Sequence, residues 1–177
     1  MIFLPTPLAD AFVIEPEAQH DERGFFARTF CAQDFARRGL CTSFAQCSIS
    51  FNARAGTLRG MHYQAEPYAE AKLVRVTQGA VYDVILDLRP HSAAYRRWFA
   101  VELSAENRKM LYVPEGFAHG FQTLANGAEV FYQISLPQVP DAARGVRWDD
   151  PAFGIQWPAA AQRQLSDRDR HYPDFRA

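Results

Sequence analysis

Short apolar and aromatic runs, separated by turn-forming residues, dominate the chain from residue 12 to residue 135. The runs are rich in Val, Ile, Phe and Tyr, the residue types that strands favour. They cover residues 12–17, 24–30, 42–51, 57–64, 71–79, 80–90, 96–104, 109–116, 118–127 and 128–135. Many short strands with regular turns predict an all-β protein. A sandwich, a jelly roll or a small barrel is expected, because these architectures hide strand edges.

Three segments depart from the strand pattern. Residues 31–39 place apolar side chains at helical spacing and end in a glycine, which predicts a helix, and residues 104–108 predict a single turn. From Val139 onward the chain is rich in Pro, Asp, Arg and Ala, which predicts irregular structure laid over the barrel rather than more sheet. With 177 residues and no internal repeat, we expect one domain spanning residues 1–177.

Composition and charge narrow the classes of function. A net charge of −1 without any basic run argues against binding to nucleic acid or to a membrane surface. The first residues lack the charged and apolar regions of a signal peptide, and no apolar run approaches the length of a membrane span, so we expect a cytoplasmic protein. Cys31, Cys41 and Cys47 are odd in number and lack CxxC spacing, which favours reduced thiols.

Two histidines lie in strand-like segments. His62 stands in TLRGMHYQ, and His119 follows the turn formed by Pro114 and Gly116 in VPEGFAHGF. An isolated histidine of this kind is most often a half-buried residue bonded to backbone. Two of them in similar contexts favour a shared pocket, in which His62 is either a metal ligand or a base for proton transfer.

The segments GMHYQ and PEGFAHGF resemble the two signature segments of the cupin superfamily, which implies a jelly-roll barrel. In metal-binding cupins the first segment carries His-x-His and a later Glu. Here Gln64 stands where the second imidazole belongs, and Glu70 is expected in a turn. The loss of a strong ligand favours a pocket without metal. A metal site formed by His62, His119 and Glu70 is the alternative.

A pocket without metal would work through proton transfer. A neutral histidine suits this task near neutral pH when a carboxylate fixes its tautomer. Lys72 is one of only two lysines and lies inside an apolar run, where it could stabilise an oxyanion in a dry cavity, and Tyr132 could return a proton from the opposite side. The ordinary alternatives are a lysine at the barrel rim and a core tyrosine. The combination of the three on neighbouring strands favours catalysis.

Strand alternation in residues 57–64 makes a specific prediction. In a regular strand His62 shares a face with Gln64, whereas Arg59 faces outward. Gly60 could host a β-bulge, a frequent feature beside active sites, and the bulge would turn Arg59 inward.

Seven ordered segments resemble the dTDP-4-dehydrorhamnose 3,5-epimerase family of cupins. They are residues 21–26, 57–64, 71–90, 101–121, 128–135, 144–158 and 165–169, and they cover nearly the whole chain. The resemblance implies a homodimeric enzyme without metal or other cofactor. It implies a nucleotide-linked 4-keto-6-deoxyhexose as substrate, with protons removed and replaced on the carbons beside the ketone.

The resemblance also implies a role for each matching residue. His62 matches the catalytic base, and Asp169 matches the carboxylate that orients it, although by itself Asp169 belongs to a charged tail that looks solvated. Lys72 matches the cation that steadies the enolate, and Tyr132 matches the acid on the far face. The residues expected at the substrate are Arg59 and His119 at the sugar, Arg23, Phe26, Gln46, Ser48 and Arg168 at the nucleotide, and Asp83 as a supporting partner. The neighbouring subunit is expected to supply part of the nucleotide contact.

Three departures from the family pattern concern recognition. Pro137 and Gln138 replace an aromatic pair, Arg28 stands where glutamate is frequent, and Ser48 stands where asparagine is frequent. They leave open the nucleotide, the hexose, and whether C3, C5 or both are inverted. Two other functions also stay open: a metal-dependent oxygenase with the same fold, and a non-catalytic module that binds a sugar nucleotide. A matched acid and base argue against the latter, since binding alone needs neither.

Overall fold

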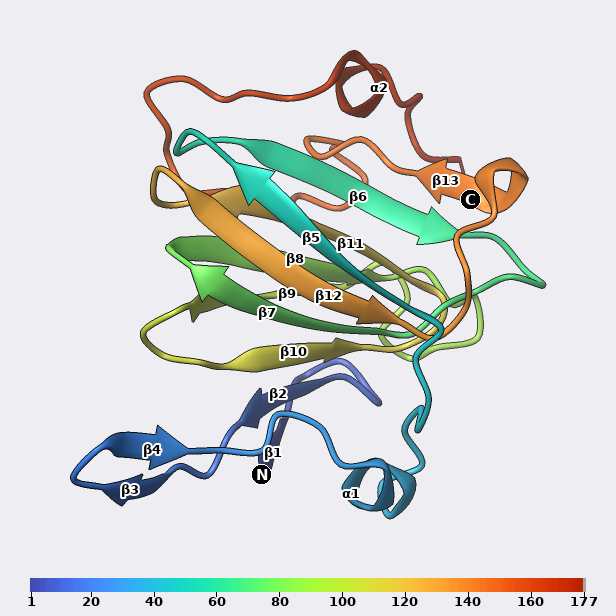
Figure 1. The fold of residues 1–177 in the computed structure, drawn as a ribbon. Helices are drawn as coiled ribbons and strands as arrows, with labels where there is room; N and C mark the ends of the chain where they lie inside the picture. The colour runs from blue at the N-terminus through green and yellow to red at the C-terminus, as the bar shows by residue number, and fades with distance from the viewer. Residues whose placement is uncertain (177) are drawn as a thin grey trace.

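Two antiparallel sheets pack face to face in this computed structural model, which describes residues 1–176 (Figure 1). The six-stranded sheet has the order β1 (Ile2–Pro5), β2 (Phe12–Glu15), β10 (Met110–Val113), β7 (Lys72–Gln78), β12 (Ala128–Ile134), β5 (Gln46–Asn52). The five-stranded sheet has the order β13 (Ala143–Gly145), β6 (Leu58–Gln64), β11 (Phe117–Thr123), β8 (Ala80–Asp87), β9 (Trp98–Ser104). The fold is the predicted jelly roll.

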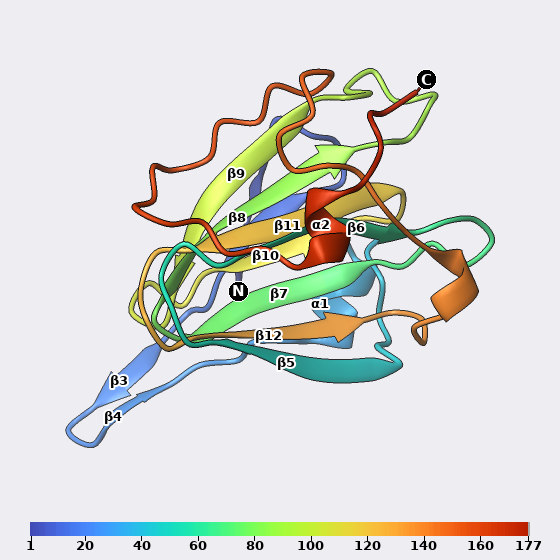
Figure 2. The ribbon, with the colours of Figure 1, turned by 90° about the horizontal axis from the view of Figure 1, so that it is seen from above.

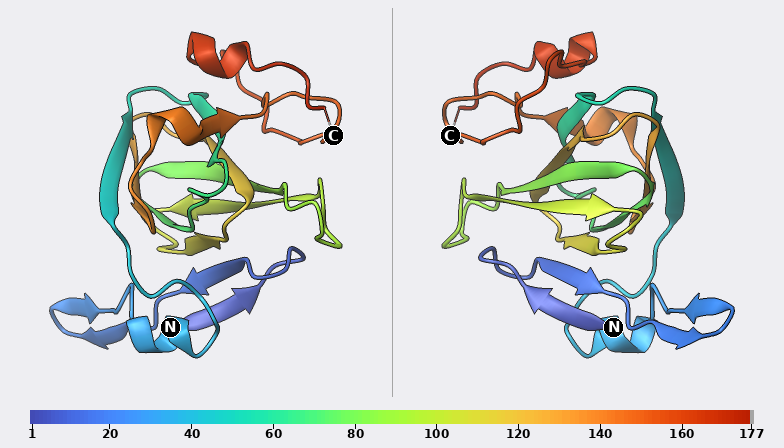
Figure 3. Two further views of the ribbon diagram at one scale, coloured as in Figure 1. Left: turned by 90° about the vertical axis from the view of Figure 1, so that its right-hand side faces the viewer. Right: turned by 90° about the vertical axis from the view of Figure 1, so that its left-hand side faces the viewer.

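The remaining elements are short. A separate hairpin of β3 (Gln19–Asp21) and β4 (Gly24–Phe26) projects from the barrel, as Figures 1 and 3 show, and α1 (Ala32–Ala36) follows it along the chain. The C-terminal part carries a 3-10 turn (Pro140–Ala142) and α2 (Asp167–Arg170), which lies next to β6 in Figure 2. None of the helices within residues 1–176 has both the length and the apolar character that crossing a membrane requires.

The strand and helix predictions are confirmed with shorter bounds. Each of the ten apolar runs coincides with one strand, although β5 ends at Asn52 and β11 begins at Phe117, each one residue outside its run; residues 31–39 contain α1, and residues 104–108 form a turn. Strands β1, β3 and β13 were not predicted. The segment after Val139 is mostly irregular, as expected, but the exclusion of further sheet was wrong because β13 pairs with β6.

Strand alternation produces three apolar clusters. Val74, Ile85, Leu111 and Val130 fill the space between the sheets and are essentially inaccessible to solvent. A second cluster lies under α1 around the fully buried Phe35, and a third lies between the five-stranded sheet and the C-terminal segment. Burial of each large apolar side chain contributes roughly 1.5–3 kcal/mol relative to exposure.

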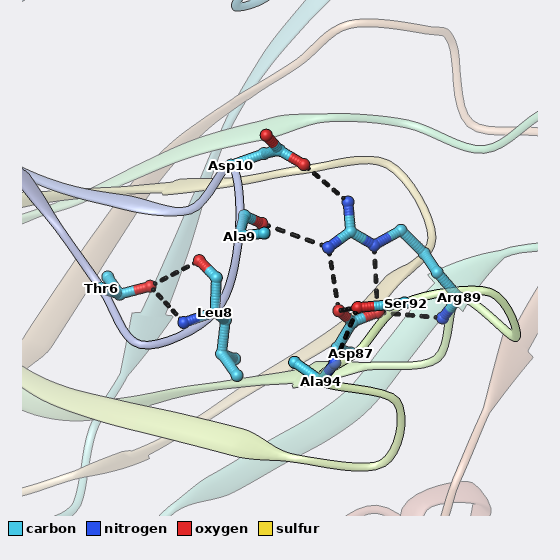
Figure 4. A network of polar contacts seen from close by, with 8 residues as sticks. All are labelled: Thr6, Leu8, Ala9, Asp10, Asp87, Arg89, Ser92 and Ala94. Atoms are coloured by element: carbon cyan, nitrogen blue, oxygen red, sulfur yellow. Dashed lines mark hydrogen bonds and ion pairs between the residues drawn. The ribbon is translucent and has the colours of Figure 1, made fainter.

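A buried carboxylate ties the N-terminal loop to the end of β8 (Figure 4). Asp87 accepts hydrogen bonds from Arg89 Nε at 3.0 Å, from Arg89 Nη2 at 2.8 Å and from Ser92 Oγ at 2.6 Å, and Arg89 also donates to Asp10 at 2.9 Å. Burial alone would raise the pKa of Asp87, but the bonds from Arg89 and Ser92 outweigh it and lower the pKa. The network therefore holds this loop through an ionised aspartate.

Candidate active site

An open cavity of about 330 Å³ lies between the two sheets. The five-stranded sheet contributes Arg59, His62 and His119, and the six-stranded sheet contributes Lys72 and Tyr132. Strands β7 and β12 are neighbours, but β6 lies in the opposite sheet. The predicted histidine, lysine and tyrosine thus line one cavity. The expectation that all three stand on neighbouring strands was wrong, and the histidine faces the other two across the cavity.

A β-bulge at Gly60 directs two side chains of β6 to the same cavity. His119 of β11 pairs with His62, whereas Phe121 pairs with Arg59, so β6 has one extra residue between the two pairs. Gly60 has φ +124°, and a Cβ at this position would lie 2.5 Å from Gly120 Cα. Arg59 therefore lines the cavity together with His62, which confirms the prediction from the sequence.

The imidazole of His62 is bound to a carboxylate from the C-terminal helix. His62 Nε2 lies 2.6 Å from Asp169 Oδ1, and Gly60 N donates to Asp169 Oδ2 at 3.3 Å. Ser166 caps α2 by accepting from Asp169 N at 3.1 Å. Asp169 is only 3% exposed, so its interpretation as part of a solvated tail was wrong.

The carboxylate of Asp169 remains ionised although it is buried. Burial by itself raises its pKa, but the hydrogen bond and charge of His62 and the bonds from Gly60 and Ser166 bring the pKa below its ordinary value. An ionised acceptor at Nε2 favours the tautomer that carries its proton there. The other ring nitrogen, Nδ1, is then free to accept a proton from a ligand.

Two further cavity residues are held by buried partners. Arg59 Nε donates to Asn52 Oδ1 at 2.8 Å, and His119 Nε2 lies 2.9 and 3.1 Å from the two carboxylate oxygens of Asp83. Asp83 is completely buried and does not line the cavity. Asp83 therefore has the supporting place that was expected for it: it holds His119 from behind and does not itself reach the cavity.

Lys72 has a buried counter-charge that was not predicted. Its Nζ lies 2.9 Å from Glu70 Oε1 and donates to the carbonyl of His62 at 3.2 Å. Glu70 does lie in the loop before β7, but its side chain is buried and lines the cavity. A lysine inside an apolar run needs a nearby anion, and this requirement was the signal in the sequence.

The alternative metal site finds no supporting geometry. Within residues 1–176, His62, His119 and Glu70 belong to no group of three His, Cys, Asp or Glu side chains that could hold an ion. Gln64, at the position of the second cupin imidazole, instead links two loops. Its Nε2 donates to Tyr68 O at 3.0 Å, and its Oε1 accepts from Val139 N at 2.6 Å.

The residues predicted for the nucleotide fall into two groups. Gln46, Ser48 and Arg168 line the cavity. Arg23 and Phe26 lie on the projecting hairpin, where Phe26 is 69% exposed, and neither reaches the cavity of its own chain. Gln138, in place of an aromatic residue, also lines the cavity. Tyr63 and Arg144 line it too and were missed, and Arg144 reaches it through the pairing of β13 with β6.

Comparisons with known proteins agree with this geometry. Residues 5–177 match the family model described as dTDP-4-dehydrorhamnose 3,5-epimerase. An enzyme of that name from Methanothermobacter thermautotrophicus is 43% identical over 176 residues, which are 98% of this chain and 94% of that protein. The crystal structure of the Elizabethkingia anophelis enzyme superimposes with a TM-score of 0.96 at 38% identity, covering 99% of this chain and 96% of that one.

A third relative was solved with a ligand. The dTDP-6-deoxy-D-glucose-3,5-epimerase of Legionella pneumophila, in complex with dTDP-4-keto-L-rhamnose, has a TM-score of 0.89 at 36% identity and covers 95% of this chain and 89% of its own. Both the sequence match and the structural match extend over almost the whole length. The chain therefore belongs to the dTDP-4-dehydrorhamnose 3,5-epimerase family.

Proposed function

We propose that the protein is an epimerase of a dTDP-linked 4-keto-6-deoxyhexose in deoxysugar biosynthesis, and that its chemistry requires no metal. One observation carries the proposal: the paired His62 and Asp169 face Lys72 and Tyr132 across a single cavity. Family membership and the dTDP-4-keto-L-rhamnose bound to the similar Legionella enzyme support the substrate class.

The first step removes a proton from a carbon beside the ketone. His62 accepts this proton on Nδ1, and Asp169 stabilises the imidazolium that forms. The electron pair of the broken C–H bond moves to the ketone oxygen and gives an enolate. Lys72, together with Arg59 and His119 from the opposite sheet, stabilises the negative oxygen, because positive groups and hydrogen-bond donors already in place bind the enolate better than the ketone.

The second step returns a proton to the same carbon from the other face. Tyr132 lies on the six-stranded sheet, opposite His62, and its phenol supplies the proton as the enolate collapses to the ketone. The configuration at that carbon is inverted because removal and return occur on opposite faces. Water then restores the protonation of both side chains, and no atom is gained or lost.

The nucleotide is proposed to lie between two subunits of a homodimer. Gln46, Ser48 and Arg168 come from the chain that holds the sugar. Arg23 and Phe26 would come from the projecting hairpin of the partner, since an aromatic ring that is 69% exposed is well placed to stack on a base. We also infer a cytoplasmic location, because all three cysteines are free thiols.

Deuterium exchange tests the function and identifies the substrate. Wild-type protein is incubated in deuterated water with several nucleotide-linked 4-keto-6-deoxyhexoses, and NMR follows C3 and C5. Wash-in with inversion is expected for a dTDP sugar, abolished in His62→Ala and preserved in His91→Ala, an exposed histidine in a turn. Absence of exchange with every sugar, or full activity of His62→Ala, would contradict the proposal.

A further inference from the structure

The ion pair of Glu70 and Lys72 has an arrangement that the two proton transfers do not explain. Both residues line the cavity, yet Glu70 is only 7% exposed and Lys72 only 9%. If Lys72 were an exposed lysine, it would serve as a counter-ion for a substrate oxygen without any carboxylate beside it. We propose that Glu70 is a positioning residue that holds the Lys72 ammonium aimed at the ketone oxygen. This inference rests on the proposed function.

The carboxylate of Glu70 is fixed at both oxygens. Oε1 lies 2.9 Å from Lys72 Nζ, and Oε2 accepts from the backbone N–H of Gln64 at 3.1 Å. Gln64 ends β6, two residues after His62, so the carboxylate connects the strand of the base to the ammonium. A buried carboxylate with both oxygens occupied is held in place, because moving it away would leave the buried ammonium without its counter-charge.

The same contacts restrict the ammonium. A lysine ammonium has three N–H donors. The carbonyl of His62 takes one at 3.2 Å, and the Glu70 carboxylate holds the group from the loop side. At least one N–H is left for a ligand in the cavity that Lys72 lines. The donor for the oxyanion is thereby anchored to the main chain of the catalytic base itself.

This anchoring matters because lysine is a flexible side chain. Its four-carbon stem has many rotamers, and an ammonium that must find its position during each turnover stabilises the enolate less than one already in place. The negative charge of Glu70 weakens the field of the ammonium somewhat. However, both of its oxygens are already occupied, one by Lys72 Nζ and the other by the backbone N–H of Gln64.

Single and paired substitutions test the inference. Glu70→Ala should lower kcat for epimerisation by roughly tenfold to a hundredfold, less than the 10²–10³-fold loss typical of removing an oxyanion donor. KM should change by less than about threefold, because only the developing charge needs an oriented ammonium. Glu70→Gln, which keeps an oxygen for Lys72, should be intermediate and serves if the alanine variant does not fold. Glu66→Gln, an exposed change in the same loop, should match the wild type.

The Lys72→Ala background separates positioning from a purely structural effect. If Glu70 acts through Lys72, adding Glu70→Ala to Lys72→Ala should lower kcat by no more than about threefold. Equal losses in both backgrounds, or a wild-type kcat for Glu70→Ala and Glu70→Gln, would overturn the inference while leaving the proposed function intact. A wild-type protein without turnover on any keto-sugar nucleotide would overturn the proposed function, and this inference with it.

Discussion

Replacing Asp169 with asparagine removes the charge behind the proposed base while keeping the shape of the side chain. Native Asp169 accepts from Gly60 N through one oxygen and contacts His62 Nε2 through the other. Asparagine has one oxygen and one NH₂ group. If its oxygen stays on the N–H of Gly60, its NH₂ faces Nε2. The ring proton then moves to Nδ1, and that nitrogen can no longer accept a proton from the substrate.

The expected kinetic loss is much larger than the loss of stability. A substitution that forces the wrong histidine tautomer costs on the order of 10³–10⁴-fold in kcat, or about 4–5 kcal/mol of barrier. Losing one hydrogen bond to a charged group costs about 2 kcal/mol, which is roughly 4–8 °C in Tm for a domain of this size. Asp169→Asn should therefore remain folded at 25 °C and be almost inactive.

Initial rates of epimerisation, followed by NMR at saturating substrate, would measure this loss beside a thermal melt. Asp167→Asn is the matched control, because Asp167 begins the same short helix but is exposed. A folded Asp169→Asn variant whose kcat lies within tenfold of the wild type would show that the carboxylate does not set the tautomer of His62. The assignment of the base would then have to be abandoned.

Three other predictions concern stability, pH and the subunit interface. Gly60→Ala should lower the free energy of unfolding, measured by calorimetry, by at least about 3 kcal/mol, because the added Cβ would meet the backbone of β11. Gly39→Ala, also at positive φ but in open space, should lower it by about 1 kcal/mol, and equal losses for the two variants would contradict this explanation. Burial raises the pKa of Asp87, but the bonds from Arg89 outweigh this effect and hold the pKa in the folded protein below the ordinary value of 3.8. The ion pair therefore contributes its full stability above pH 3.8, and this contribution is lost as the pH falls through the pKa of the folded state. Chemical denaturation should show that Asp87→Asn lowers the free energy of unfolding most near pH 6 and progressively less below about pH 4. A loss of stability that does not change with pH would refute this link between the ion pair and the pH. Phe26→Ala should raise KM for the dTDP sugar by roughly 5- to 100-fold if the ring stacks on the base in the partner subunit, and an unchanged KM would argue against that contact.

The sequence pattern predicts much of the barrel but little of the site's support. Alternation identifies the strands that form the core, and Gly60 marks where a bulge could turn Arg59 inward. Asp169 could be assigned only through the family resemblance. It is 107 residues from His62 along the chain, and no local pattern reports such a contact.

The missed features share a physical cause. Glu70 looks like a turn residue because its backbone does lie in a loop, and only the tertiary fold reveals that its side chain is buried against Lys72. Strand β13 was missed since three residues carry no recognisable period, although its pairing with β6 brings Arg144 to the cavity. Short elements and loop side chains depend on packing rather than on propensity.

Assaying Tyr132→Phe in deuterated water shows whether two side chains act on opposite faces of one carbon. The side chain of His62 is 43% exposed, so its captured proton can exchange with solvent and return to the face it left. This variant should still incorporate deuterium from solvent, with the starting configuration retained and inversion reduced by at least about a hundredfold. Inversion at the wild-type rate, or loss of exchange together with inversion, would contradict the action of the two side chains on opposite faces.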